Sequence, residues 1–337
     1  MSRKLGEHSG THNRRFVEPE VGGSSPPNCT IRQTLPMRRL DSRPIPSTPG
    51  EIRAFLPVRN EALRLPDNLN HHRGLGVSRF FVADNGSVDG TLEFLLAQPD
   101  VHLFRADQSF AASGFGMAWM NQLLDEYGCG HWTLTVDADE LLIYPGIETV
   151  PLTRVCTHLD HLGAQGMFCM LLDMYADRPL NDVGYRAGDS LLAACPWFDP
   201  APYRTVQVHA FPHIQIYGGV RERIFHFSAS PAPHPPTISK VPLVKWTRGM
   251  QFTNCTHAVS PMPLAQMTGV LLHFKFLDDF YQRVQVEAAR GEHYADGLEY
   301  KIYAQLLAQN PALTLRDQNS ARLQSSRQLV EMGLMAI

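Results

Sequence analysis

The chain has 337 residues, of which 44% are hydrophobic and 19% are charged, a composition typical of a globular protein that buries a core. Its formal net charge of −3 gives no overall basic character, which argues against nucleic acid as a partner. The sequence has no apolar run of about 18 residues and its six cysteines have no CxxC spacing, so we expect no transmembrane segment, no structural zinc site and a cytoplasmic protein with reduced thiols, and we leave peripheral membrane contact open.

The N-terminal segment, residues 1–49, is rich in Arg, Ser, Pro and Gly and shows no apolar periodicity. Such a segment cannot bury enough surface to offset the entropy lost on ordering. Its first residues also lack the apolar stretch of a secretory signal. We therefore predict a disordered tail over 1–49.

From residue 51 onward, apolar runs alternate with segments of helical spacing. The pattern predicts strands over 52–58, 79–84, 101–106 and 131–145, and helices over 61–76, 91–99 and 115–128. Alternating strands and helices are typical of a parallel sheet that has helices on both faces.

Beyond Pro145 the pattern is less regular. Further strands are predicted within 163–176 and over 270–276, and from Leu277 onward helical spacing dominates. We predict one α/β catalytic domain over 50–276, made of a nucleotide-binding half (50–145) and an acceptor half (146–276), followed by a helical C-terminal extension over 277–337.

Polar clusters follow three of the predicted strands. They are Arg59-Asn60-Glu61, Asp84-Asn85-Gly86-Ser87 and Asp137-Ala138-Asp139-Glu140. In open α/β sheets, ligands bind beyond the carboxyl ends of the strands, so these clusters are the candidate site.

The third cluster carries two carboxylates one residue apart, Asp137 and Asp139. Mg²⁺ and Mn²⁺ prefer oxygen ligands and often bridge protein carboxylates to a diphosphate. The alternative is an acidic turn that caps a following helix. The motif alone does not separate these two interpretations.

The clusters form an ordered set: VRNE (58–61), DNGSVDGT (84–91) and DADE (137–140). This set resembles the nucleotide-sugar-binding half of family 2 glycosyltransferases, in the bacterial branch with these signatures. The resemblance extends more loosely through GGVRER (218–223), KVPLVKW (240–246), CTH (255–257) and LLHFKF (271–276). It implies a GT-A fold, which is a Rossmann-like mixed sheet flanked by helices, a nucleotide-diphosphate-sugar donor, a Mn²⁺ or Mg²⁺ ion and inversion at the anomeric carbon.

The resemblance also implies roles for individual residues. It places the nucleotide against Arg59, Asn60 and Glu61, and the base and ribose against Asp84. Asp139 would bind the metal directly, with Asp137 nearer the ribose or a metal-bound water. The glycine pair Gly218 and Gly219 would let the backbone approach donor and acceptor.

Inverting transfer needs a group that takes the proton of the acceptor hydroxyl. Many relatives carry a Glu-Asp pair after the glycines, whereas this chain has Arg-Glu-Arg. Glu222 is our candidate for the base, and His257 and Asp173 are its rivals.

The late segment LLHFKF adds two candidates. Strand alternation puts His273 and Lys275 on the same face. His273 would complete the metal shell, and Lys275 would neutralise the departing diphosphate. The alternative is a half-buried histidine beside a solvated lysine.

Together these features predict a metal-dependent glycosyltransferase that moves a sugar to the hydroxyl of a glycan, lipid or small-molecule acceptor. Two alternatives remain. A protein that binds a nucleotide sugar without catalysis would share the donor site. A sugar nucleotidyltransferase is less favoured, because VRNEALRLP lacks the glycine-rich basic loop that such enzymes carry after their first strand.

Overall fold

The computed structural model describes residues 35–226 and 235–337, all of which belong to one compact unit. Most of the predicted disordered tail, residues 1–34, lies outside the described residues. Within the remaining residues, 35–49, Met37–Arg39 forms strand β1 and pairs antiparallel with β4, so the prediction of disorder is wrong for this stretch. Arg39 reinforces this edge through an ion pair with Asp41 (2.7 Å).

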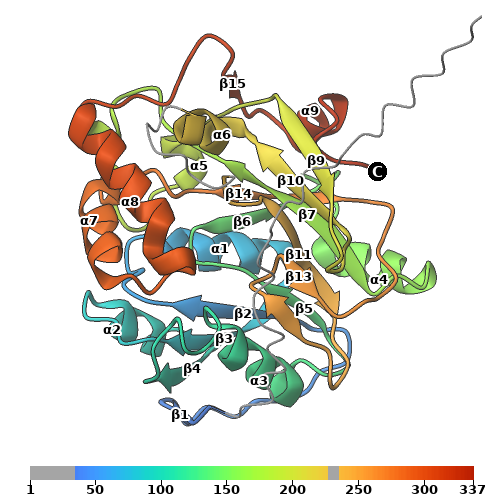
Figure 1. Ribbon diagram of the computed structural model, residues 1–337. Coiled ribbons are helices and arrows are strands. Elements are labelled where there is room, and N and C mark those ends of the chain that lie inside the picture. Colours follow the sequence, from blue (N-terminus) through green and yellow to red (C-terminus); the bar gives the residue numbers. More distant parts are fainter. Residues whose placement is uncertain (1–34, 227–234) are drawn as a thin grey trace, which may run out of the picture. The chain divides into compact units, whose positions relative to one another are not determined.

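A nine-stranded sheet runs through the described residues in the order β1-β4-β3-β2-β5-β11-β7-β14-β6 (Figure 1). Its strands after β1 are β4 Val101–Ala106, β3 Val77–Asp84, β2 Ile52–Val58, β5 Trp132–Thr135, β11 Ser239–Lys245, β7 Gly166–Asp173, β14 Gly269–His273 and β6 Glu140–Ile143. Strands β4, β3, β2 and β5 are parallel, β11 is antiparallel to both of its neighbours, β14 is parallel to β7, and β6 is antiparallel to β14. The sheet is mixed and flanked by helices, as the predicted fold class requires.

Both faces of the sheet are covered because its central strands are apolar on both sides. In β2, Ala54 and Leu56 belong to one core cluster, while Phe55 belongs to the other. Helices α1 (Leu65–Leu75) and α4 (Leu152–His161) contribute to the first cluster, and α3 (Met117–Tyr127) contributes to the second. The short helix α2 (Thr91–Leu96) packs beside β4.

The predicted strand over 131–145 is two strands. β5 lies beside β2 in the middle of the sheet, whereas β6 forms its far edge. Residues 136–139 make the turn between them, and the backbone N–H of Glu140 donates to the carbonyl of Asp137 (3.1 Å). The acidic cluster is therefore the connection between two distant positions of the sheet.

The rest of the segment 146–276 is made of short elements. They are η1 Leu180–Asp182, α5 Leu191–Ala194, β8 Trp197–Phe198, β9 Tyr203–Gln207, β10 Ile214–Gly218, α6 Gly219–His226, β12 Phe252–Asn254 and β13 Ala258–Val259. Strands β9 and β10 form a hairpin apart from the main sheet.

The C-terminal segment contains α7 (Phe280–Arg290), α8 (Tyr294–Gln309), strand β15 (Ala321–Arg322) and α9 (Ser326–Glu331). Helices α7 and α8 share a core cluster with α6 that includes Phe276 and Tyr303, and β15 pairs with β8. The predicted C-terminal extension thus packs against the rest of the described unit. Among the described residues, none of the helices combines the length and apolar character needed to span a bilayer.

Candidate active site

The loops after β2 and β3 are joined to each other by hydrogen bonds. The backbone N–H of Asn60 donates to Ser87 Oγ (2.8 Å), and Asn60 Oδ1 accepts from the backbone N–H of Val88 (2.8 Å). The backbone N–H of Glu61 donates to Thr91 Oγ1 (2.9 Å). Two of the predicted polar clusters therefore meet at the carboxyl ends of neighbouring parallel strands.

Asp84 is fully buried at the end of β3. Its carboxylate accepts from the backbone N–H groups of Gly86 (3.1 Å) and Ser87 (3.2 Å), and it forms an ion pair with Arg105 (3.0 Å). Arg59 donates to the carbonyl of Asn85 (2.5 Å). Asp84 thus shapes this loop. Its predicted contact with a base and ribose stays a prediction.

Asp139 meets the late histidine. His273 is in register with Glu140 on β6 and with Asp173 on β7, because β14 lies between these two strands. Its Nε2 is 3.3 Å from Asp139 Oδ2, and its Nδ1 is 2.5 Å from Asp173 Oδ1. Arg221 from α6 closes the row, with Nε 2.8 Å from Asp173 Oδ2. Residues from four parts of the chain, namely the turn before β6, β14, β7 and α6, thus form one buried polar row: Asp139, His273, Asp173 and Arg221.

The proton on His273 Nδ1 follows from its partners. Arg221 Nη2 is 3.0 Å from both Asp173 Oδ1 and His273 Nδ1. A guanidinium only donates and an ionised carboxylate only accepts, so we assign Asp173 Oδ1 as the shared acceptor and place a proton on Nδ1. In many metal sites a ligating histidine likewise donates its other ring N–H to a carboxylate.

Charges in the row shift one another's pKa values. Burial opposes the charged form of Asp139, but His273 lies so close that the pKa of Asp139 falls well below its usual range. For Asp173 burial again acts in the opposite direction, and Arg221 and His273 together lower the pKa. Burial would lower the pKa of His273, yet Asp139 and Asp173 raise it to about 8.

The free energy of unfolding should therefore fall above neutral pH, as His273 loses its proton. Because its folded pKa of about 8 lies above its unfolded value of about 6.5, its contribution is complete below pH 6.5 and is lost as the pH rises through 8. The shift corresponds to about 2 kcal/mol. Urea unfolding in EDTA at pH 6 and pH 9 measures it, with His273→Gln as the matched variant. An equal pH dependence in both proteins would contradict the prediction.

Asp137 points away from this row. Its side chain is 51% exposed and lies 3.2 Å from Lys240 Nζ, which is also 2.7 Å from Glu140 Oε1. Burial raises the pKa of Glu140 to about 7, and the attraction of Lys240 only partly opposes this rise. Lys240 therefore positions the acidic turn from β11.

Two of the three side chains predicted to bind a metal lie together. Asp139 and His273 present a carboxylate oxygen and an imidazole nitrogen to each other. The carboxylate is the ligand type that Mn²⁺ and Mg²⁺ prefer, whereas the imidazole is more typical of softer metals. Asp137 is held by Lys240 instead. Within residues 35–226 and 235–337, no group of three or more His, Cys, Asp or Glu side chains is arranged as a metal site. The carboxylate of Asp139 fits such an ion, His273 would be its second ligand, and the remaining ligands would come from the nucleotide sugar or water.

The glycine pair lies where β10 passes into α6. Gly218 has φ 147° and a Cβ there would come within 2.4 Å of the carbonyl of Pro202, and Gly219 has φ 66°. The pair is therefore required by the tight turn and by the contact with Pro202. Glu222 follows in the first turn of α6, 3.6 Å from Arg204 Nε.

The two rival bases are differently placed. His257 donates from Nδ1 to the carbonyl of Ser239 (2.6 Å), and burial, together with the nearby Lys240, lowers its pKa to about 3. Such a weakly basic imidazole is a poor proton acceptor at neutral pH. Both carboxylate oxygens of Asp173 are already engaged by Arg221 and His273.

Lys275 is enclosed, unlike the solvated lysine of the alternative interpretation. Its Nζ is 2.5 Å from Glu299 Oε1 and lies 4.8 Å from the ring centroids of both Tyr300 and Tyr303. These contacts attach α8 to the end of β14. Lys275 is therefore committed to packing, and the structure does not present it to a diphosphate.

A second charged cluster joins the C-terminal helices to the loop after β2. Arg64, which is fully buried, forms two hydrogen bonds with Asp279 (2.7 Å each) and donates to the carbonyl of Phe274 (3.2 Å). Glu61 pairs with Arg283 of α7. Sequence reasoning missed both arginines, since neither stands in a motif.

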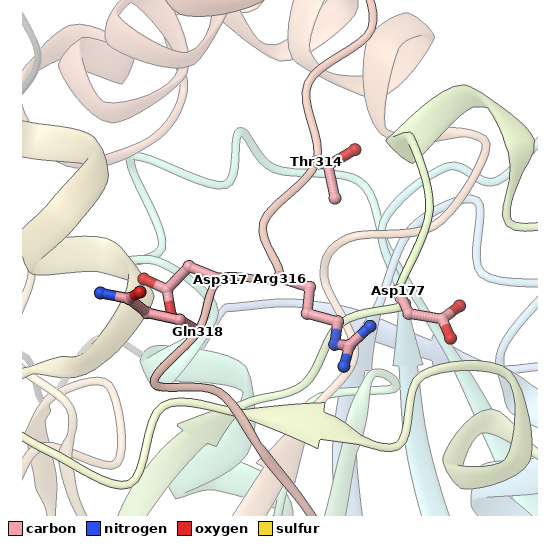
Figure 2. Close-up of a pocket in the computed structure, with 5 residues that line it drawn as sticks. All are labelled: Asp177, Thr314, Arg316, Asp317 and Gln318. Atoms are coloured by element: carbon pink, nitrogen blue, oxygen red, sulfur yellow. The ribbon is translucent and has the colours of Figure 1, made fainter.

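A separate hollow lies among residues that no motif singled out. It has a volume of about 360 Å³ and is lined by Asp177, Thr314, Arg316, Asp317 and Gln318 (Figure 2). Arg316 also lies 4.1 Å above the ring of Trp197. Because none of the lining residues belongs to the polar row, the hollow and the candidate site are distinct features.

Comparison with known proteins adds little to this geometry. No protein-family model and no curated protein matches the chain. Solved structures with some likeness include S. aureus TarS 1–349 (17% identity, 42% of this chain and 48% of that chain, TM-score 0.30). They also include a UTP-bound UGPase from Acinetobacter baumannii (11% identity, 77% of this chain and 99% of that chain, TM-score 0.32). A third is a putative glucose-1-phosphate thymidylyltransferase from Bacillus anthracis (9% identity, 77% of this chain and 84% of that chain, TM-score 0.29). The chain spans about half the length of the TarS structure, and at these TM-scores the matches carry no functional inference.

Proposed function

We propose that this chain is an inverting, metal-dependent glycosyltransferase that moves a sugar from a nucleotide-diphosphate donor to an acceptor hydroxyl. The observation that carries the proposal is the row Asp139–His273–Asp173, which lies at strand ends in a mixed α/β sheet. A carboxylate and an imidazole oriented by a second carboxylate form the kind of pair that binds a divalent ion.

On the donor side, the joined loops at 59–61 and 84–87 would bind the nucleotide. Asp139 and His273 would hold Mn²⁺ or Mg²⁺, with Asp137 nearer the ribose. When bound, the ion would neutralise charge on the departing diphosphate. Asp173 keeps the His273 ring in one orientation, and Arg221 in turn holds Asp173.

On the acceptor side, Glu222 remains the candidate base. The acceptor oxygen would form a bond to the anomeric carbon as its proton passes to the carboxylate and the bond to the diphosphate breaks. The glycine turn places Glu222 in the first turn of α6, and Arg204 lies close enough to pair with it. The low pKa of His257 and the double engagement of Asp173 favour Glu222 over both.

A nucleotide screen tests this proposal. We expect one of UDP, GDP or dTDP, or its sugar conjugate, to stabilise the protein only when Mn²⁺ is present. At a ligand concentration of 100 times Kd, the rise in Tm should be about 5 °C.

Hydrolysis of the stabilising sugar conjugate then separates an enzyme from a binding protein. Release of free sugar that depends on Mn²⁺ supports the enzyme. Stabilisation without any turnover would favour the binding protein, and the absence of stabilisation by all of these ligands would refute the proposal.

A further inference from the structure

Arg283 extends from the first turn of α7 into the candidate donor site. Its Nη2 pairs with Glu61 Oε1, and Glu61 follows β2 in the loop expected to bind the nucleotide. The side chain is 24% exposed. Its Nη1 is buried and has no hydrogen-bond partner among the described residues. A buried donor without an acceptor is uncommon and calls for an explanation.

Short contacts connect Arg283 to the backbone of Asp139. The backbone carbonyl of Asp139 accepts from the N–H of Phe274 (2.8 Å), and the carbonyl of Phe274 accepts from Arg64 Nε (3.2 Å). Arg64 Nη1 in turn lies 3.6 Å from Glu61 Oε2, on the residue that Arg283 contacts. Arg283 therefore belongs to the same cluster of charges as Asp139. Its charge also contributes to the lowered pKa of Asp139, after that of His273.

The other cations of this region are committed elsewhere. Arg64 is saturated by Asp279 and a carbonyl, Arg221 by Asp173, Lys240 by Glu140 and Asp137, and Lys275 by Glu299. Within the described part of the chain, Arg283 alone of these five combines a buried, unpaired N–H with a contact to the VRNE loop. A guanidinium presents its donors as a planar fork that suits phosphate oxygens.

We propose that Arg283 binds the diphosphate of the donor, in the role that the sequence suggested for Lys275. This inference rests on the proposed function and adds a residue to its donor site. Before the donor binds, Glu61 holds the guanidinium. On binding, phosphate oxygens accept from Nη1 and compete with Glu61. The C-terminal helical segment thereby supplies part of the donor site.

Titration calorimetry with Mn²⁺ tests the proposal, using UDP, GDP and dTDP and the corresponding monophosphates. For the diphosphate that binds the wild-type protein, Arg283→Gln should weaken affinity about 10- to 100-fold. Affinity for the monophosphate should change much less, because the contact is with the diphosphate. Arg290→Gln is the matched control, since Arg290 lies on the same helix and pairs with Glu287 (2.8 Å). It should bind both nucleotides as the wild type does.

The double variant Glu61→Gln/Arg283→Gln separates phosphate binding from a merely structural role. If Arg283 serves only to neutralise Glu61, the double variant recovers wild-type affinity for the diphosphate, and the proposal is overturned. The double variant also removes the carboxylate that Arg283→Gln would leave without its arginine. Its affinity can therefore be measured even if Arg283→Gln folds poorly. If the wild type binds a diphosphate and Arg283→Gln binds it with the same affinity, this inference alone is overturned. If the wild type binds none of the diphosphates, the proposed function is overturned as well.

Discussion

Asp139→Asn is expected to reduce kcat/KM for donor turnover at least about 1,000-fold, which corresponds to about 4 kcal/mol of transition-state stabilisation. Asparagine keeps the volume of the side chain but removes its charge, so it binds a divalent cation far more weakly. It also removes the charge that faces His273 Nε2 at 3.3 Å. Rates measured over a range of Mn²⁺ concentrations should show that the metal no longer stimulates the variant.

Asp160→Asn is the matched control for this change. Asp160 pairs with Lys245 (2.7 Å) at a partly exposed position and is not a candidate site residue. Its variant should retain wild-type turnover. Circular dichroism and Tm establish that both variants are folded. Turnover of Asp139→Asn within tenfold of the wild type would remove Asp139 from the proposed metal site.

Lys240→Met is expected to lower the free energy of unfolding by about 3–5 kcal/mol, because it leaves a buried carboxylate without its partner. The Lys240 and Glu140 side chains are only 4% and 1% exposed, and their charged atoms are 2.7 Å apart. Urea unfolding measures the loss. The double variant Lys240→Met/Glu140→Gln should recover much of it, since no unpaired charge is then buried.

The loss should also grow with pH. Burial already raises the pKa of Glu140 to about 7, and the loss of Lys240 raises it further above the unfolded value of about 4.3. A carboxyl group with a raised folded pKa takes up a proton at low pH, so Lys240→Met should be less destabilised at pH 6 than at pH 8. A loss below about 1 kcal/mol at pH 8 would show that the ion pair is not important for stability.

Local patterns predicted the first half of the fold well. Strands β2, β3 and β4 and helices α1 and α3 each carry a periodic or continuous apolar pattern of their own, and that pattern is visible without knowledge of any partner. The polar residues after β2 and β3 follow from the same reasoning, because parallel strands end at a common edge.

Which strands pair with each other in the sheet was not predictable in the same way. Residues 131–145 read as one apolar strand, since nothing local indicates that β5 pairs with β2 while β6 pairs with β14. β1 was missed because its three residues, Met-Arg-Arg, have no strand pattern and are ordered by pairing with β4.

The candidate site shows the same limit. The motif predicted Asp139, and the strand pattern suggested His273, but Glu61 and Arg283 are 222 positions apart and neither pattern connects them. Lys275 stands on the expected face of a late strand, yet its role depends on Glu299, Tyr300 and Tyr303 of a helix whose docking the sequence does not reveal.

The position of β14 has a consequence for folding during translation. β14 is translated after both β7 and β6, yet it inserts between them. A nascent chain that ends before β14 therefore contains β6 and β7 without the strand that pairs with both. At that stage Asp139 and Asp173 lack their common partner, His273. This side of the sheet can therefore close only after β14 has been translated.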